Sequence, residues 1–264
     1  MLGIHLPLSN PLSGCVVNAT ELGCDTFQIF IRNNRNMNQR SFSKSEINVF
    51  NSYLMRSNVK SVVVHASYAM NPCTDDEEKR KRYLDIVKSD MNVMHQFYKD
   101  VRYVIHPGSS MMIPPDIAMC NLVNFMSEVV QMAGSVTVCA EYMAGAGTQM
   151  IDNVEDCKYL LQAVSGLKLC FDTCHAFASQ DSLFYPFSSL LDDVGVLHLN
   201  NSFYGERTYK DRHAPIVDGH IPTQQLLNIA KLLHVRYPDV PTILETPGEF
   251  LEQDFRYVKE FIET

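Results

Sequence analysis

The feature that most constrains this 264-residue chain is a short apolar run that recurs eight times along it. Each run is followed by polar residues, as repeated βα units require. Continuous apolar runs of this length are typical of parallel strands that are buried on both faces. We therefore predict eight parallel strands, at residues 2–6, 26–31, 61–65, 103–106, 137–141, 168–172, 196–199 and 242–245.

Helical periodicity fills several of the intervals between these runs. The clearest helix is predicted at 75–99, where an acidic first turn suits the helix dipole and apolar residues recur at helical spacing. Eight strands separated by helices favour a closed (β/α)₈ barrel over the alternative, an open doubly wound sheet. No linker or low-complexity tract divides the chain, so we predict one α/β domain, a TIM barrel, over residues 1–264. Further helices are predicted at 45–57, 115–133, 153–165, 222–236 and 251–263.

The composition is that of a packed intracellular enzyme. With 46% hydrophobic and 20% charged residues, the chain leaves little room for disorder. It contains no run of about 18 apolar residues that could span a membrane, and residues 1–5 do not resemble a signal peptide. We expect a protein that is located in the cytoplasm, or in the nucleus of a eukaryotic or virus-infected cell, and has no membrane partner.

Cysteine usage and charge narrow the class further. The eight cysteines include no CxxC pair, which argues against a zinc ribbon and against a disulfide framework. Most are expected to be reduced and buried, with a thiol ligand from Cys170 or Cys174 as an alternative. The formal charge of −8 argues against a polyanionic partner, but three divalent ions would bring the loaded protein to about −2.

Six consecutive strands are predicted to end at a residue that can bind metal. In a barrel, the carboxyl ends of all strands face the same mouth, so these side chains converge there. Any one of them alone is better explained as a buried core histidine or a helix-capping carboxylate. Six together need a metal to compensate the burial of so much charge. These strand-end residues are His65, His106, Glu141, Asp172, His198 and Glu245.

Two further segments enlarge this set. His175 follows Asp172 by three residues, on the loop that we predict there, and Asp211 and His213 can project to one side of the long loop after the seventh strand. The total of nine ligands is too large for one tetrahedral site and suits three ions with a bridging carboxylate. Histidine-rich sets favour zinc over magnesium, with manganese possible at one position. Clustered zinc ions activate water and polarise phosphodiesters, so the ligand set predicts phosphate ester hydrolysis.

Several motifs resemble those of the endonuclease IV family of apurinic/apyrimidinic endonucleases, and together they span nearly the whole chain. The two most specific are the string from Asp172 to Ala178 and the triplet from Asp211 to His213. The matching segments are His65-Ala66-Ser67-Tyr68, His106-Pro107-Gly108-Ser109, Ala140-Glu141-Tyr142 with Ala144-Gly145-Ala146-Gly147, Phe171-Asp172-Thr173-Cys174-His175-Ala176-Phe177-Ala178, His198-Leu199-Asn200, Asp211-Arg212-His213 and Leu244-Glu245-Thr246.

The resemblance implies a monomeric (β/α)₈ barrel with three zinc ions that acts in base excision repair. It implies cleavage of double-stranded DNA 5′ to an abasic nucleotide, which leaves a 3′-hydroxyl, and removal of 3′ blocking groups. Extruding an abasic nucleotide costs less than flipping an intact base. Glu141 is implied to position the attacking hydroxide and to act as base. The implied ligand sets are His65, His106 and Glu141; Glu141, Asp172, His198 and Glu245; and His175, Asp211 and His213.

The resemblance also assigns residues that contact DNA. Arg35 matches an arginine that is inserted into the duplex, and Tyr68 matches a wedging aromatic residue. Two departures weaken this wedge, because Met37 stands where the family often has tryptophan and Ala69 stands where a bulkier aliphatic residue is usual. The segment 214–220 also departs from the family's glycine-rich pattern. The remaining histidines are treated as non-ligands, namely His5, His95, His220 and His234.

Two other functions are compatible with part of this pattern. A sugar isomerase or epimerase of the same barrel class would use four carboxylate and histidine ligands, matched by Glu141, Asp172, His198 and Glu245. Such an enzyme does not require the other five ligands. A barrel kept only to bind damaged DNA would be expected to have lost ligands, and the chain keeps all nine.

Overall fold

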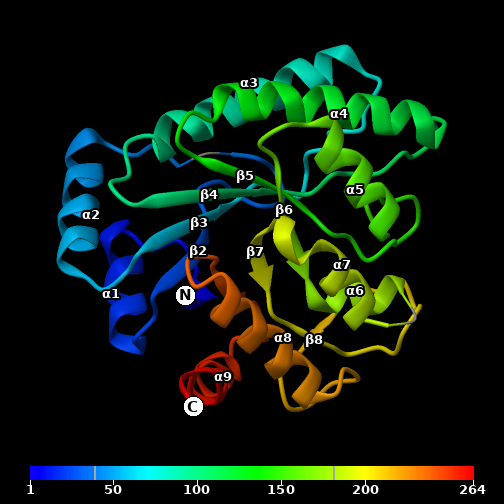
Figure 1. Cartoon of the computed structure of the whole chain (residues 1–264). Helices are drawn as coiled ribbons and strands as arrows, with labels where there is room; N and C mark the ends of the chain where they lie inside the picture. Colours follow the sequence, from blue (N-terminus) through cyan, green and yellow to red (C-terminus); the bar gives the residue numbers. More distant parts are fainter. Residues whose placement is uncertain (39, 181) are drawn as a thin grey trace.

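Eight parallel strands close into a barrel, which confirms the predicted fold class (Figure 1). The computed structural model describes residues 1–38, 40–180 and 182–264. The first barrel strand pairs with both the second and the last, so the sheet has no open edge and the open-sheet alternative is excluded. The barrel strands are β1 (Leu2–His5), β2 (Thr26–Phe30), β3 (Ser61–His65), β4 (Asp100–Ile105), β5 (Thr137–Glu141), β6 (Lys168–Asp172), β7 (Val194–His198) and β10 (Thr242–Leu244).

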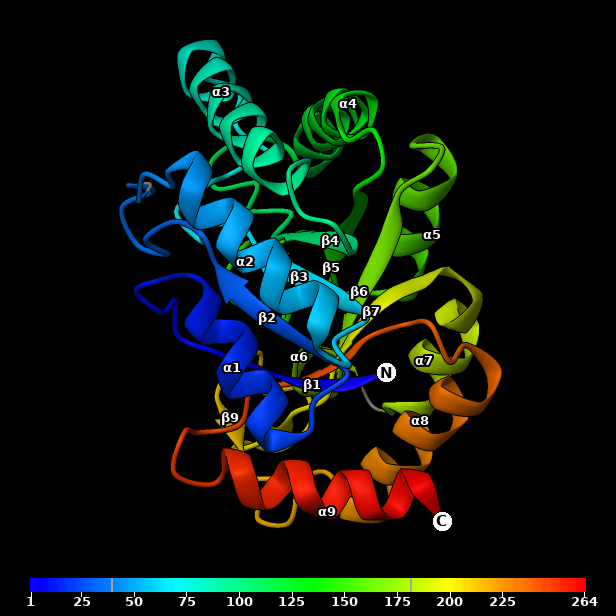
Figure 2. The same cartoon turned by 90° about the vertical axis from the view of Figure 1, so that its left-hand side faces the viewer.

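Helices cover the outside of this barrel (Figures 1 and 2). A short antiparallel pair, β8 (Asn201–Ser202) and β9 (His213–Ala214), stands apart from it. Among the described residues, no helix combines the length and the apolar character that a membrane span requires. The helices are α1 (Ser13–Leu22), α2 (Lys44–Arg56), α3 (Glu77–Met94), α4 (Pro115–Met132), α5 (Val154–Ala163), α6 (Thr173–Ser179), α7 (Phe184–Leu190), a 3₁₀ turn (Leu191–Asp193), α8 (Thr223–Arg236) and α9 (Leu251–Glu263).

Three helices, α1, α6 and α7, were not predicted from the sequence. The α7 helix is only seven residues long and contains Pro186 in its first turn, where a helix tolerates proline. The α6 helix begins directly where β6 ends, because the Asp172 carboxylate accepts a hydrogen bond from the His175 backbone N–H and caps the helix. The prediction that His175 lies on a loop is therefore wrong, since this residue belongs to the first turn of α6.

Side chains alternate between two apolar layers along six of the barrel strands, β3 to β7 and β10. One layer lies between the barrel and the helices and includes the large side chains Tyr103 and Phe171. The other fills the barrel interior, and we call it the inner plug. A strand buried on both faces needs apolar residues at successive positions, which explains the continuous runs in the sequence. The inner plug consists of Val63, Val104, Cys139, Cys170, Val196 and Ile243, all fully buried.

A buried ion pair ties the loop after β2 to the neighbouring elements. Arg32 Nε donates to Asp90 Oδ1 on α3 at 2.6 Å, and the hydroxyl of Tyr103 on β4 donates to Asp90 Oδ2 at 2.8 Å. Arg32 also donates to the backbone carbonyls of Met37 and Ile86. The hydrogen bonds of Arg32 and Asp90 thus fix the loop that carries Arg35 to α3 and β4.

Candidate metal centre

The strand-end ligands occupy the layer directly above the inner plug. Each of the six lies two residues after a member of that plug, as His65 follows Val63 and Glu141 follows Cys139. Because side chains alternate along a strand, a residue two positions on points the same way, into the barrel, one layer nearer the carboxyl end. The register of the barrel therefore places all six side chains at one mouth.

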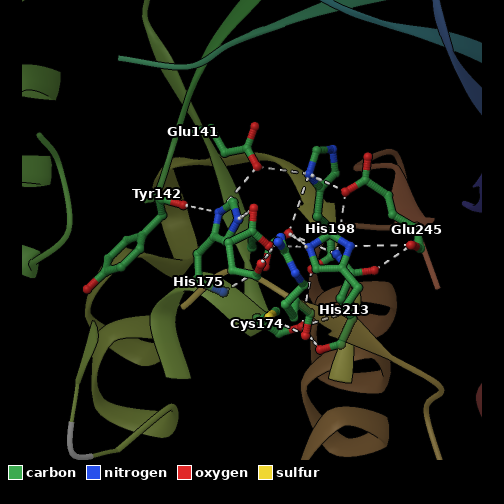
Figure 3. Close-up of polar contacts among 12 residues, drawn as sticks. Glu141, Tyr142, Cys174, His175, His198, His213 and Glu245 are labelled. Atoms are coloured by element: carbon green, nitrogen blue, oxygen red, sulfur yellow. Dashed lines mark hydrogen bonds and ion pairs between the residues drawn. The ribbon is translucent and has the colours of Figure 1, made fainter. Parts of the chain in front are cut away.

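Glu141 lies at the centre of this layer and contacts four imidazoles. Its Oε2 atom is 3.0 Å from His65 Nε2 and 3.1 Å from His106 Nε2. Its Oε1 atom is 3.3 Å from His198 Nδ1 and 3.4 Å from His175 Nδ1 (Figure 3). The two oxygens thus face different groups of histidines, which is the geometry of a carboxylate that can bridge two cations.

A second group surrounds one nitrogen of His198. The fully buried Nδ1 atom is 3.2 Å from Glu245 Oε2, 3.3 Å from Glu141 Oε1 and 3.7 Å from Asp172 Oδ2. In Figure 3, His198 lies between Glu141 and Glu245. One imidazole nitrogen among three carboxylates is a donor set for a divalent cation.

A third group combines α6 with the segment that leads into β9. Asp211 Oδ2 is 3.4 Å from His175 Nε2, and Asp211 Oδ1 is 3.4 Å from His213 Nε2. His213 Nε2 also lies 3.7 Å from Asp172 Oδ2, which joins this group to the second. The structure therefore brings all nine predicted ligands into one continuous cluster.

Three buried nitrogens in the cluster have no hydrogen-bond partner. They are His175 Nε2, His198 Nδ1 and His213 Nε2. Each faces carboxylate oxygens at 3.2 to 3.7 Å without forming a hydrogen bond to them. Buried polar atoms are rarely left unpaired, and nitrogen lone pairs gathered with carboxylates match the ligand chemistry of zinc. The residues present therefore fit a metal centre.

The charges of the cluster stabilise one another. Burial alone would raise the pKa of Glu141, but the neighbouring imidazoles of His106 and His198 hold that pKa well below its usual range. Burial would lower the pKa of His198, but Glu245 and Glu141 raise it to about 9. Glu141 is therefore ionised, and its negative charge attracts positive charge to the layer of ligands.

Two thiols, those of Cys170 and Cys174, lie next to the cluster and within reach of its carboxylates and imidazoles. Burial raises the pKa of Cys170 well above its usual range, and it raises the pKa of Cys174 to about 12. Cys174 donates its thiol hydrogen to the backbone carbonyl of Arg212. Cys120 is exposed and the other seven cysteines are buried, as the sequence predicted for most of them.

Three polar residues that the sequence reasoning missed support the ligands. Gln28 donates to Glu245 Oε1 at 2.6 Å and to His5 Nδ1 at 2.9 Å. Asn200 donates to Asp172 Oδ2 at 2.8 Å and accepts from the Glu245 backbone N–H. His5, which was treated as a non-ligand, lies 3.3 Å from Glu245 Oε1. A polar residue inside an apolar run, such as Gln28, is the sequence signal that could have revealed these supporting residues.

The cluster opens into a cavity of about 390 Å³. Tyr68 lines this cavity with 47% of its surface exposed, and its ring centroid is 5.1 Å from that of His106 and 5.4 Å from that of His65. Arg35 does not line the cavity and is exposed on the loop after β2. Met37 on the same loop is half-buried and packs against the core, so it does not project outward as a wedge.

The chain is similar to known proteins over nearly its full length. The family described as xylose isomerase-like TIM barrel matches residues 16–263. A protein of Finegoldia magna named probable endonuclease 4 is 32% identical over 257 residues, which covers 94% of this chain and 91% of that relative.

The chain is also similar to solved structures over nearly its full length. The crystal structure of endonuclease IV from Thermus thermophilus has a TM-score of 0.85 at 27% identity and covers 99% of this chain and 98% of that one. A D-tagatose 3-epimerase-like protein has a TM-score of 0.76 at 20% identity, with coverage of 99% and 97%, which shows a shared fold alone.

Proposed function

The chain belongs to the endonuclease IV family of xylose isomerase-like TIM barrels, and on that premise we propose that it is a DNA repair hydrolase that cuts 5′ to abasic nucleotides. The product ends would be a 3′-hydroxyl and a 5′ deoxyribose phosphate. The observation that carries this proposal is the continuous cluster of five imidazoles and four carboxylates at the barrel mouth. We assign the removal of 3′ blocking groups to the same site, since it breaks the same kind of bond.

Three zinc ions would occupy this cluster, with manganese possible at one position. His65, His106 and Glu141 would hold the first ion, and all three lie within contact distance of one another. His175, Asp211 and His213 would hold the third. The second would lie among Glu141, Asp172, His198 and Glu245. When bound, zinc supplies Lewis acidity that polarises a phosphodiester and neutralises the charge that develops on its oxygens.

Glu141 would position the attacking water. Its carboxylate is buried and ionised, so both oxygens are acceptors. This carboxylate would fix the direction of the water lone pair and act as the base that accepts the proton of the water. The water oxygen attacks phosphorus, the bond from phosphorus to the 3′ oxygen breaks, and a proton passes to that oxygen.

Two side chains outside the cluster would contact the DNA. Tyr68 stands at the rim of the cavity, where a partly exposed ring can stack in the space that the missing base leaves. Arg35 is presented on a loop that Arg32 fixes to the barrel, so its guanidinium can enter the duplex from a rigid support. An extruded abasic nucleotide would bring its 5′ phosphate to the ligands.

Cleavage of a defined lesion tests this function directly. The zinc-loaded protein is incubated with a duplex that carries a single tetrahydrofuran analogue of an abasic site. We expect one nick, 5′ to the lesion, that leaves a 3′-hydroxyl. Binding without a nick would favour a DNA-damage binding module. A protein that holds only one or two equivalents of manganese or magnesium, and leaves the duplex intact, would favour a sugar isomerase.

Replacing Glu141 separates chemistry from binding. Glu141→Gln keeps the shape of the side chain but removes the charge that orients the water, so kcat for the nick should fall by about 10²- to 10⁴-fold. Affinity for the duplex should stay within a few-fold of wild type, as measured by fluorescence anisotropy. Unchanged turnover would remove Glu141 from the mechanism.

A further inference from the structure

Each of four ligand histidines forms a hydrogen bond through one ring nitrogen, while its other nitrogen faces carboxylates of the cluster. For His65, His175 and His213 the partner is a backbone carbonyl, which belongs to Ala66, Tyr142 and Glu245 respectively. For His198 the partner is a side chain, because its Nε2 atom lies 2.8 Å from Gln28 Oε1. Among these four histidines, only His198 has a side chain as its hydrogen-bond partner, so only its hydrogen bond can be removed by a substitution.

The orientation of the Gln28 amide follows from its neighbours. Glu245 is one of the proposed metal ligands, and a carboxylate that binds a metal can only accept hydrogen bonds. The amide NH₂ of Gln28 therefore faces Glu245 Oε1, at 2.6 Å, and also lies 2.9 Å from His5 Nδ1. The amide oxygen then faces His198 Nε2.

The tautomer of His198 follows in turn. An imidazole that binds a metal is neutral and has one proton, and because the amide oxygen of Gln28 can only accept, that proton is on Nε2. The lone pair is then on Nδ1, the atom that faces Glu245, Glu141 and Asp172. The other four ligand histidines have a different arrangement, because each of them turns Nε2 toward a carboxylate of the cluster.

We propose that Gln28 is a positioning residue of the metal centre, which holds His198 in the one tautomer that binds through Nδ1 and orients Glu245 at the same time. Gln28 lies on β2, which together with β1 supplies none of the nine ligands. It is fully buried, and both amide hydrogens and the amide oxygen have partners within the centre. This inference rests on the metal centre of the proposed function.

Isotope-edited NMR of the zinc-loaded protein with ¹⁵N-labelled histidine tests the tautomer without any substitution. We expect one ligand imidazole with a protonated Nε2 and a zinc-bound Nδ1, and four with the opposite pattern. A spectrum in which all five ligand imidazoles bind through Nε2 would overturn the proposal.

Two substitutions separate the two tasks of Gln28. Gln28→Leu removes every hydrogen bond, so the Nε2-protonated signal should be lost and zinc affinity should fall by about 10- to 100-fold in competition with a chromophoric chelator. Gln28→Glu keeps an acceptor for His198 but places a second carboxylate beside Glu245. We expect it to retain the signal while its zinc affinity changes.

Thr26→Val is the matched control. Thr26 is buried on the same strand, two residues before Gln28, and its hydroxyl bonds to Ser61, which is not a ligand. This variant should keep both the signal and the affinity. If Gln28→Leu binds zinc as wild type does, with an unchanged spectrum, Gln28 has no positioning role. A wild-type protein that takes up fewer than three equivalents of zinc would instead contradict the proposed function.

Discussion

Asp211 differs from the other carboxylates of the cluster in its exposure. Glu141 and Asp172 are buried below it, whereas Asp211 stands at the rim between the Nε2 atoms of His175 and His213. An exposed residue contributes little to the core, so its substitution should affect metal binding without unfolding the barrel.

Asp211→Asn is expected to reduce the zinc content from three equivalents to two. The substitution removes the only carboxylate of the third proposed set, and ligand charge strongly influences the affinity for divalent ions. The measurement is metal analysis after gel filtration. Asp218→Asn, at an exposed carboxylate seven positions further along the chain, is the control that should keep three equivalents. Three retained equivalents in Asp211→Asn would remove this residue from the ligand set.

The sequence could identify the ligands better than the residues that support them. A histidine or carboxylate at the end of an apolar run stands out, because burial of such a group is unfavourable unless something compensates it. Six of them at strand ends are expected to meet at one mouth of the barrel. Gln28 and Asn200 carry no formal charge, and their partners become apparent only when the barrel closes. Whether Arg35 and Tyr68 contact DNA stays a prediction.

At the scale of the elements, the position of the loop after β2 depends on the buried guanidinium of Arg32. Burial raises the pKa of Asp90 to about 6 even though Arg32 lies beside it. Arg32→Met would leave this carboxyl buried without its partner, which typically costs about 3–5 kcal/mol of unfolding free energy. The loop that carries Arg35 would also lose its bond from Arg32 to the Met37 carbonyl.

This loss should depend on pH. Without Arg32 the folded-state pKa of Asp90 rises further above its unfolded value of about 3.9. A carboxyl with a raised folded-state pKa costs stability as pH rises through that value. Urea denaturation should therefore show a larger deficit at pH 8 than at pH 5. Arg256→Met, at an exposed helical ion pair with Glu252, should change stability by less than about 0.5 kcal/mol at either pH. An equal deficit at both pH values would contradict this account.

The strands were easier to predict than the helices between them. The predictions for β3, β5 and β6 have the bounds of the structure, because two apolar layers force continuous runs there. β4 begins at Asp100, before its predicted start at Tyr103. The prediction started late because charged residues interrupt the apolar run at the beginning of this strand. The predicted helix at 75–99 spans Glu77–Met94. The α6 helix starts at a strand-end ligand, where the sequence gives no sign of a new element.

At the scale of the whole molecule, the metal centre joins strands from most of the barrel. The proposed ligands on β3, β5, β6 and β7, and directly after β4 and β10, are far apart in sequence, so an ion bound among them stabilises the closed barrel over the unfolded chain. A metal ion present at 1,000 times its Kd adds about 4 kcal/mol to the free energy of unfolding. This corresponds to an increase in Tm on the order of 10 °C for a protein of this size.

Chelation should therefore lower the Tm by roughly 10 °C or more, and one zinc equivalent after another should restore it. Magnesium should not replace zinc, because it prefers oxygen ligands and keeps its waters. Differential scanning calorimetry measures both effects. A Tm that is indifferent to chelation would show that the cluster does not bind metal in the folded protein.

The central claim is that nine side chains hold three cations at one barrel mouth, and anomalous diffraction at the zinc edge tests it most directly. Crystals grown with zinc should show three anomalous peaks, one in each proposed ligand set, with Glu141 shared between the first and the second. Peaks elsewhere on the surface, or none among these nine side chains, would contradict the account.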